Sequence, residues 1–232
     1  MDQNIIYKIL YGSQVYGTAD ENSDTDIRGI WLPSIDQSLS MKELKDIKYV
    51  YGEEDVLIFP LQKFFKLALK CNPSVFEWMF VPKNCIIIDT PASDVLVKSR
   101  GMFLSQEIYH RFKGYAWSEF SSITKLSGPT GEKRKQQILK YGYSPKNGMN
   151  CIRLIEQAIE LLTEQTIHFP RPNAEELLGI KHGEWPYQKV VQKFNNLLEK
   201  LEEAKEKTTL PEKADFDYIN EFMVFIIKEY GK

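Results

Sequence analysis

The chain has 232 residues, of which 43% are apolar and 12% aromatic, and its formal net charge at pH 7 is −2. These values exclude an intrinsically disordered chain and a protein that binds nucleic acid through a broadly basic surface. No apolar run approaches the ~18 residues of a membrane span, and the N-terminal segment lacks the pattern of a secretory signal. We therefore expect a cytoplasmic protein with no membrane partner.

The first hundred residues predict strands that alternate with short helices. β-rich runs predict four strands, at residues 5–11, 26–32, 55–59 and 85–89. From Leu61 the apolar residues follow a helical spacing as far as Asn72-Pro73, which predicts a helix directly after the third strand. We expect a short mixed or antiparallel sheet with helices on one side.

After about residue 100 the strand signals nearly vanish and helical periodicity takes over. It predicts helices at residues 105–125, 132–140, 145–163, 186–207 and 216–230. The chain is therefore expected to be α+β, with a sheet-containing domain at residues 1–100 and an α-helical domain at residues 101–232.

Two aspartates separated by one residue stand at the start of the second predicted strand. In a strand, residues two apart point to the same face, so Asp24 and Asp26 would project together. Two carboxylates side by side suit a divalent cation such as Mg²⁺, which prefers oxygen ligands and borrows others from substrate phosphates. Taken singly, the same residues also fit a solvated acidic turn.

A third carboxylate is needed to complete such a site. Asp55 is the best candidate because it opens the next apolar strand, and Glu53 and Glu54 are alternatives that a shift of register would favour. If Asp55 comes opposite the first two acids, the three could bind two metal ions about 4 Å apart.

A Gly-Ser pair precedes these acids at the end of the first predicted strand. Glycine at position 12 lets backbone approach a bulky anion, and Ser13 can offer its N–H and its hydroxyl to phosphate. The alternative for Gly12-Ser13 alone is a hairpin turn. Together with the acids, the pair predicts a site that holds a triphosphate beside its metals.

These residues resemble a known family. Gly12-Ser13 followed by Ser23-Asp24-Thr25-Asp26 resembles the signature of nucleotidyltransferases of the DNA polymerase β superfamily. More closely, residues 11–33, 55–80 and 152–162 resemble the predicted nucleotidyltransferases described as RNA-repair-associated. The resemblance implies a nucleotidyltransferase core followed by an α-helical C-terminal half.

The resemblance also implies roles for individual residues. Gly12 and Ser13 would hold the β and γ phosphates of a nucleotide such as ATP, and Arg28 would contact phosphate or acceptor. Two Mg²⁺ or Mn²⁺ ions would be bound by three catalytic acids, Asp24, Asp26 and Asp55. For the Asn72-Pro73-Ser74-Val75-Phe76-Glu77-Trp78 segment, which matches a family motif, no catalytic role can be derived.

The chain departs from the family pattern before its second conserved helix. Histidines are expected there, in a Lys-His-x-x-His-like arrangement, whereas this chain has Asn147 and Asn150. Lys146 and Arg153 are retained as candidate nucleotide-binding residues. Asparagines keep hydrogen-bonding capacity but lose the positive charge that histidine can carry, so the substrate is expected to differ from that of close relatives.

The expected function is the transfer of a nucleoside monophosphate from an NTP to an acceptor hydroxyl, with release of pyrophosphate. An RNA 3′ end is the preferred acceptor, by family association. Two alternatives remain open at this point. One is the same reaction on a protein hydroxyl, as in antitoxin-like nucleotidyltransferases, and the other is a non-catalytic nucleotide-binding protein.

Overall fold

The computed structural model describes residues 4–21, 23–126 and 131–231. The chain divides into two compact units, one made of Met1–Leu104 with Lys213–Lys232 and the other of Ser105–Glu212. The division into a domain at residues 1–100 and a domain at residues 101–232 stays a prediction. The last helix belongs to the sheet-containing unit, although it comes at the end of the chain.

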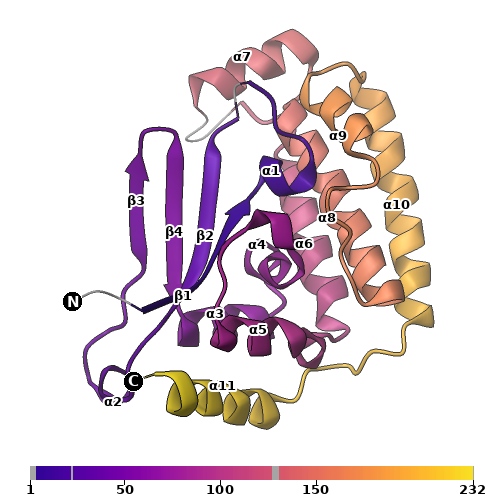
Figure 1. Ribbon diagram of the computed structural model, residues 1–232. Helices are drawn as coiled ribbons and strands as arrows, with labels where there is room; N and C mark the ends of the chain where they lie inside the picture. The colour runs from indigo at the N-terminus through magenta and orange to yellow at the C-terminus, as the bar shows by residue number, and fades with distance from the viewer. Residues whose placement is uncertain (1–3, 22, 127–130, 232) are drawn as a thin grey trace. The chain divides into compact units, whose positions relative to one another are not determined.

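A five-stranded sheet forms the centre of the first unit, with the strand order β3-β4-β2-β1-β5. Figure 1 shows β3, β4, β2 and β1 side by side in that order. The strands are β1 (Asn4–Tyr11), β2 (Thr25–Leu32), β3 (Ile47–Tyr51), β4 (Glu54–Pro60) and β5 (Ile86–Ile88). Only the pair β2 and β4 is parallel, and the other neighbours are antiparallel. The predicted mixed sheet is confirmed, and β3 was not predicted.

Short helices accompany the sheet. They are α1 (Ser13–Tyr16), α2 (Ile35–Leu39), α3 (Leu61–Leu69), α4 (Pro73–Phe76) and α5 (Pro91–Lys98), with 3₁₀ turns at Glu77–Phe80, Lys83–Cys85 and Arg100–Phe103. Trp78 stacks on Phe59 of β4, with 5.4 Å between the ring centroids, and its carbonyl accepts a hydrogen bond from the Tyr7 hydroxyl of β1. The residues after α4 are thereby fixed to the middle of the sheet.

The last helix, α11 (Phe216–Tyr230), packs against α3. Its buried residues Ile219, Ile226 and Ile227 fall on one side of the helix, as the 3.6-residue period requires. The ring of Phe222 lies 6.2 Å from that of Phe65 in α3. Burial of this apolar side explains why the end of the chain belongs to the first unit.

The second unit is helical, as predicted for this half of the chain. It contains α6 (Glu107–Ser121), α7 (Glu132–Tyr141), α8 (Pro145–Glu164), α9 (Ala174–Lys181) and α10 (Tyr187–Lys207). Helix α8 contacts α6, α9 and α10, and twelve of its residues are buried. Within the described part of the chain, no helix is both long enough and apolar enough to cross a membrane.

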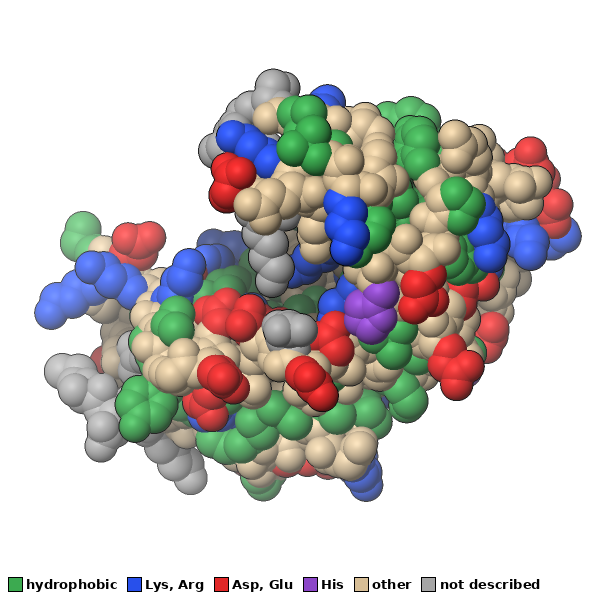
Figure 2. Space-filling view, turned by 90° about the horizontal axis from the view of Figure 1, so that it is seen from above, with side chains coloured by type: hydrophobic (Ala, Val, Ile, Leu, Met, Phe, Trp, Pro, Cys, Tyr) green, Lys and Arg blue, Asp and Glu red, His purple; other side chains and the backbone are tan. Residues whose placement is uncertain are grey.

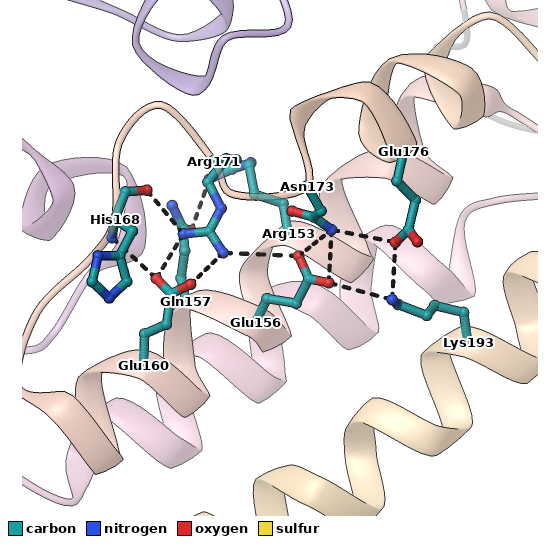
Figure 3. Close-up of polar contacts among 9 residues, drawn as sticks. All are labelled: Arg153, Glu156, Gln157, Glu160, His168, Arg171, Asn173, Glu176 and Lys193. Carbon is teal, nitrogen blue, oxygen red and sulfur yellow. Dashed lines mark hydrogen bonds and ion pairs between the residues drawn. The ribbon is translucent and has the colours of Figure 1, made fainter.

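A network of polar side chains fastens the segment after α8 to this helix (Figure 3). The Arg171 guanidinium donates two parallel hydrogen bonds to Glu160, of 2.7 and 2.8 Å, and lies 3.8 Å from Glu156. Burial raises the pKa of Glu156 above its ordinary value, an effect that the Arg171 charge opposes. Asn173 also donates to Glu156, and Lys193 of α10 lies 3.7 Å from it. The Arg171 side chain is 1% exposed, so little water reaches it, and the carboxylates of Glu160 and Glu156 are its counter-ions.

Replacement of Arg171 by methionine tests this network. Because Arg171→Met would leave Glu160 and Glu156 without their buried counter-ion, we expect a loss of about 3 kcal/mol or more in the free energy of unfolding. Lys207→Met is the control, since Lys207 forms an exposed ion pair with Glu203 one helical turn away and should cost less than about 0.5 kcal/mol. Urea titrations measure both, and equal losses would contradict the assignment.

Candidate functional site

Two predicted acids meet at one end of the sheet. In the parallel pair of β2 and β4, Asp26 is the direct partner of Asp55, so both side chains project from the same face. One nitrogen of Arg28, Nη2, lies between them, 2.7 Å from Oδ1 of Asp26 and 3.2 Å from Oδ2 of Asp55. The structure therefore brings Asp26, Asp55 and Arg28 into direct contact.

Arg28 is also held by the backbone. Its second terminal nitrogen, Nη1, donates to the carbonyl of Ile27 at 2.9 Å and to that of Asp55 at 2.6 Å. The guanidinium lies 5.8 Å from the ring centroid of Tyr11, and its side chain is 14% exposed. Two carboxylates and two carbonyls thus fix the position of this cation at the site.

The Gly12 backbone lies against one of these acids, Asp26. Tyr11, the last residue of β1, pairs with Asp26, so the chain turns into α1 directly beside the Asp26 carboxylate. A Cβ atom at Gly12 would come within 2.4 Å of Oδ2 of Asp26, and Gly12 has a φ of +65°. Its carbonyl accepts hydrogen bonds from the N–H groups of Val15 and Tyr16, and Ser13 is the first residue of α1. Glycine is therefore required here both by conformation and by space.

A buried carboxylate that sequence analysis could not interpret anchors this turn. Glu77 is fully buried and accepts hydrogen bonds from the hydroxyls of Tyr11, at 3.1 Å, and Tyr16, at 2.6 Å. These tyrosines stand on either side of Gly12-Ser13. Glu77 thus helps to fix the turn that contacts Asp26.

The remaining predicted acid is placed differently. Asp24 is exposed and lies directly before β2, which begins at Thr25. Among the described residues, no three His, Cys, Asp or Glu side chains form a group that could hold a metal ion, and the triad stays a prediction.

The structure separates Asp55 from its two alternatives. Glu53 lies in the turn between β3 and β4, and Glu54 pairs with Thr25 and projects from the other face of β4. Figure 2 looks onto this end of the sheet and shows acidic side chains gathered at the surface. The exposed acids from the described residues at this end are Glu21, Asp24, Glu53 and Glu54.

The other two candidate residues belong to α8 in the second unit. Lys146 is exposed, whereas Arg153 is 7% exposed and donates to Oε1 of Gln157 at 2.9 Å. Asn147, one of the two departures from the family pattern, accepts from the Ser144 hydroxyl and donates to Glu119 of α6 at 2.7 Å. Asn147 therefore joins the start of α8 to α6.

The sequence matches a described family over almost its whole length. The family model for the RNA repair pathway DNA polymerase beta family, RlaP, matches residues 1–225. The chain belongs to the RlaP family. The resemblance found in the sequence is thereby confirmed, and membership of this family supports a nucleotidyltransferase-like function.

Individual relatives of this RlaP chain are more distant. A stretch of 77 residues is 29% identical to the uncharacterized protein YcgL of Bacillus subtilis (strain 168), which is 32% of this chain and 30% of YcgL. The match thus spans less than a third of that relative. Among solved structures, a nucleotidyltransferase-like protein from Exiguobacterium sibiricum 255-15 is 12% identical, with a TM-score of 0.30 over 88% of this chain and 69% of the other.

Replacement of Gly12 by alanine tests the contact between the turn and the acid pair. We expect Gly12→Ala to displace the Asp26 carboxylate and to lower the free energy of unfolding by about 2 kcal/mol or more, from overpacking and a positive φ. Gly52→Ala is the control, because Gly52 has a φ of +61° but no atom within 4 Å of an added Cβ. Urea unfolding in EDTA measures both.

A double-mutant cycle separates the contact from the conformational cost. In an Asp26→Ala background the carboxylate is gone, so Gly12→Ala should cost at least about 1 kcal/mol less than in the wild type. An equal cost in both backgrounds would show that Gly12 does not act on Asp26.

Proposed function

We propose that this RlaP-family chain transfers a nucleoside monophosphate from an NTP to an acceptor hydroxyl, with the help of divalent cations. The observation that carries the proposal is the pair Asp26 and Asp55, placed side by side on neighbouring strands with the Gly12 backbone against Asp26. A glycine backbone next to one of two paired carboxylates suits a phosphate that is held together with its cation.

The two carboxylates fit a divalent cation. Within the described chain, Oδ2 of Asp26 and Oδ1 of Asp55 accept no hydrogen bond, because Arg28 takes only the other oxygen of each. Carboxylate oxygens are the ligands that Mg²⁺ prefers, and Mn²⁺ accepts the same set. We propose Asp26 and Asp55 as ligands of two such ions, with Asp24 as the third. The cations would neutralise phosphate charge and activate the attacking hydroxyl.

The protein's own groups would position the reactants. The N–H and hydroxyl of Ser13 are proposed to bind the β and γ phosphates, and Arg28, Lys146 and Arg153 are further proposed contacts of the nucleotide. The acceptor hydroxyl loses its proton to solvent, and its oxygen forms a bond to the α-phosphorus as the bond between that phosphorus and the bridging oxygen breaks, so that pyrophosphate leaves. An RNA 3′ end is the proposed acceptor, by family association, and the cytoplasm is the proposed location.

Substitution of the paired acids tests the reaction. Asp26→Asn and Asp55→Asn keep the size of each side chain but remove its charge, so we expect transfer of label from α-labelled NTPs to fall on the order of a hundredfold or more. Glu53→Gln and Glu54→Gln are matched controls in the same segment and should keep activity, because Glu53 lies in the turn before β4 and Glu54 projects from its other face.

The assay uses Mg²⁺ or Mn²⁺, each of the four NTPs, and a panel of RNA ends and cellular proteins as acceptors. Label that survives in an Asp24→Ala/Asp26→Ala variant would refute the mechanism. Label found on proteins alone would replace RNA by a protein hydroxyl as the acceptor. Absence of transfer by the wild type with every acceptor would favour a non-catalytic nucleotide-binding protein.

A further inference from the structure

Arg28 lies at the point where a cation is needed to hold two acids together. A single nitrogen, Nη2, contacts both carboxylates, and the adjacent Nη1 is tied to two backbone carbonyls. Asp26 and Asp55 are 30% and 42% exposed at their side chains, whereas Arg28 is 14% exposed. The arginine is therefore the most enclosed of the three groups, and the backbone holds it in place independently of the acids.

This arrangement balances charge within the protein. Carboxylates that face each other on neighbouring strands repel one another, and like charges at such positions destabilise a sheet. With Arg28 between them, the net charge of the three groups is −1 instead of −2. The acid pair thus has a counter-ion before any metal ion arrives.

The same charge opposes the binding of a divalent cation. At a separation of about 5 Å, even in the dielectric of water, the repulsion between one and two unit charges amounts to more than about a tenfold loss of affinity. Arg28 also fixes the two carboxylates, which favours binding, but the ordering of short side chains is worth only a few-fold. Because the first effect is larger, removal of the charge should tighten cation binding.

We propose that Arg28 is the resident counter-ion of the acid pair, which keeps its affinity for a divalent cation low until a nucleotide triphosphate supplies further negative charge. The nucleotide in this statement rests on the proposed function. The triphosphate attracts the cation and offsets the guanidinium, so cation and nucleotide bind cooperatively. By linkage, the cation must raise the affinity for the nucleotide by the same factor.

Mn²⁺ binding without nucleotide tests the proposal, with free Mn²⁺ measured by electron paramagnetic resonance. We expect Arg28→Gln and Arg28→Met, which remove the charge, to bind Mn²⁺ at least about tenfold more tightly than the wild type. Arg28→Lys keeps the charge but loses the planar fork, and it should remain within about threefold of the wild type. Adding Asp26→Asn to each variant should abolish the differences.

The temperature of thermal unfolding is a second measure of how the Arg28 charge affects stability and Mn²⁺ binding. In EDTA, the two neutral variants should unfold at a lower temperature than the wild type, and Mn²⁺ should restore them more than it stabilises the wild type. A purely structural role of Arg28 would lower the stability of Arg28→Lys and Arg28→Gln alike, with equal shifts on Mn²⁺ addition. That result would overturn the proposal, as would weaker Mn²⁺ binding by the neutral variants.

The wild type alone provides a test that does not require the variants to fold. An ATP analogue with a non-hydrolysable α–β bridge should bind at least about tenfold more tightly with Mn²⁺ than in EDTA, and a change below about threefold would overturn the proposal. Failure of the proposed function has a different signature. It would appear as absence of nucleotide transfer by the wild type, while the Mn²⁺ affinities of the Arg28 variants still followed the charge at position 28.

Discussion

The parallel pairing of β2 with β4 is the constraint on which the candidate site depends. Parallel neighbours need a long crossover, and here the chain between Leu32 and Glu54 passes through α2 and β3 before it returns. The register is set on the opposite face, where Ile27, Trp31, Val56 and Ile58 form a buried apolar cluster. A slip of β4 by one residue would turn Val56 and Ile58 out of this cluster and replace Asp55 by Glu54 at the site. The apolar face therefore selects which acid meets Asp26.

Strand β2 also determines where the Gly12 turn lies. Because β1 pairs antiparallel with β2, Tyr11 comes opposite Asp26, and the next residue must turn away within contact distance of the carboxylate. Glu77 then ties Tyr11 and Tyr16 together from a 3₁₀ turn far along the chain. The turn is thus determined by one strand pairing and one buried carboxylate, and not by the Gly-Ser pair alone.

These dependencies show which parts of the fold the sequence could predict. The four predicted strands are recognisable because apolar β-formers dominate them, and the helices of the second half because their apolar stripes are long. Strand β3 was not predicted although four of its five residues are β-formers. It lies at the edge of the sheet with four residues exposed, so its sequence lacks the strict apolar–polar alternation that marks a strand with one buried face. The role of Glu77 could not be predicted for another reason. Its tyrosine partners are 61 and 66 residues away, so no local sequence pattern indicates these hydrogen bonds.

The acids illustrate the same limit at finer scale. A period of two tells which residues share a face of one strand, but not where that strand begins or which residue it meets on the next one. The period of two places Asp24 on the same face as Asp26, but β2 begins one residue after Asp24. Asp55 was preferred to Glu53 and Glu54 by the apolar run that follows it, and only the pairing with Asp26 distinguishes the three. Register requires the whole sheet, because it is fixed by contacts between segments.

Arg28 shows how the structure changes the chemistry expected of a correctly placed residue. The period of two puts it on the face of Asp26, where phosphate or acceptor was the expected partner. In the structure both terminal nitrogens are engaged with four acceptors of the protein itself, and the contact with a nucleotide stays a prediction. A phosphate that bound this guanidinium would have to displace a carbonyl or a carboxylate, and each displaced group would lose a charge-assisted hydrogen bond. Among the described residues the N–H and hydroxyl of Ser13 donate to no protein acceptor, so the Gly12-Ser13 turn is the better-suited phosphate contact of the two.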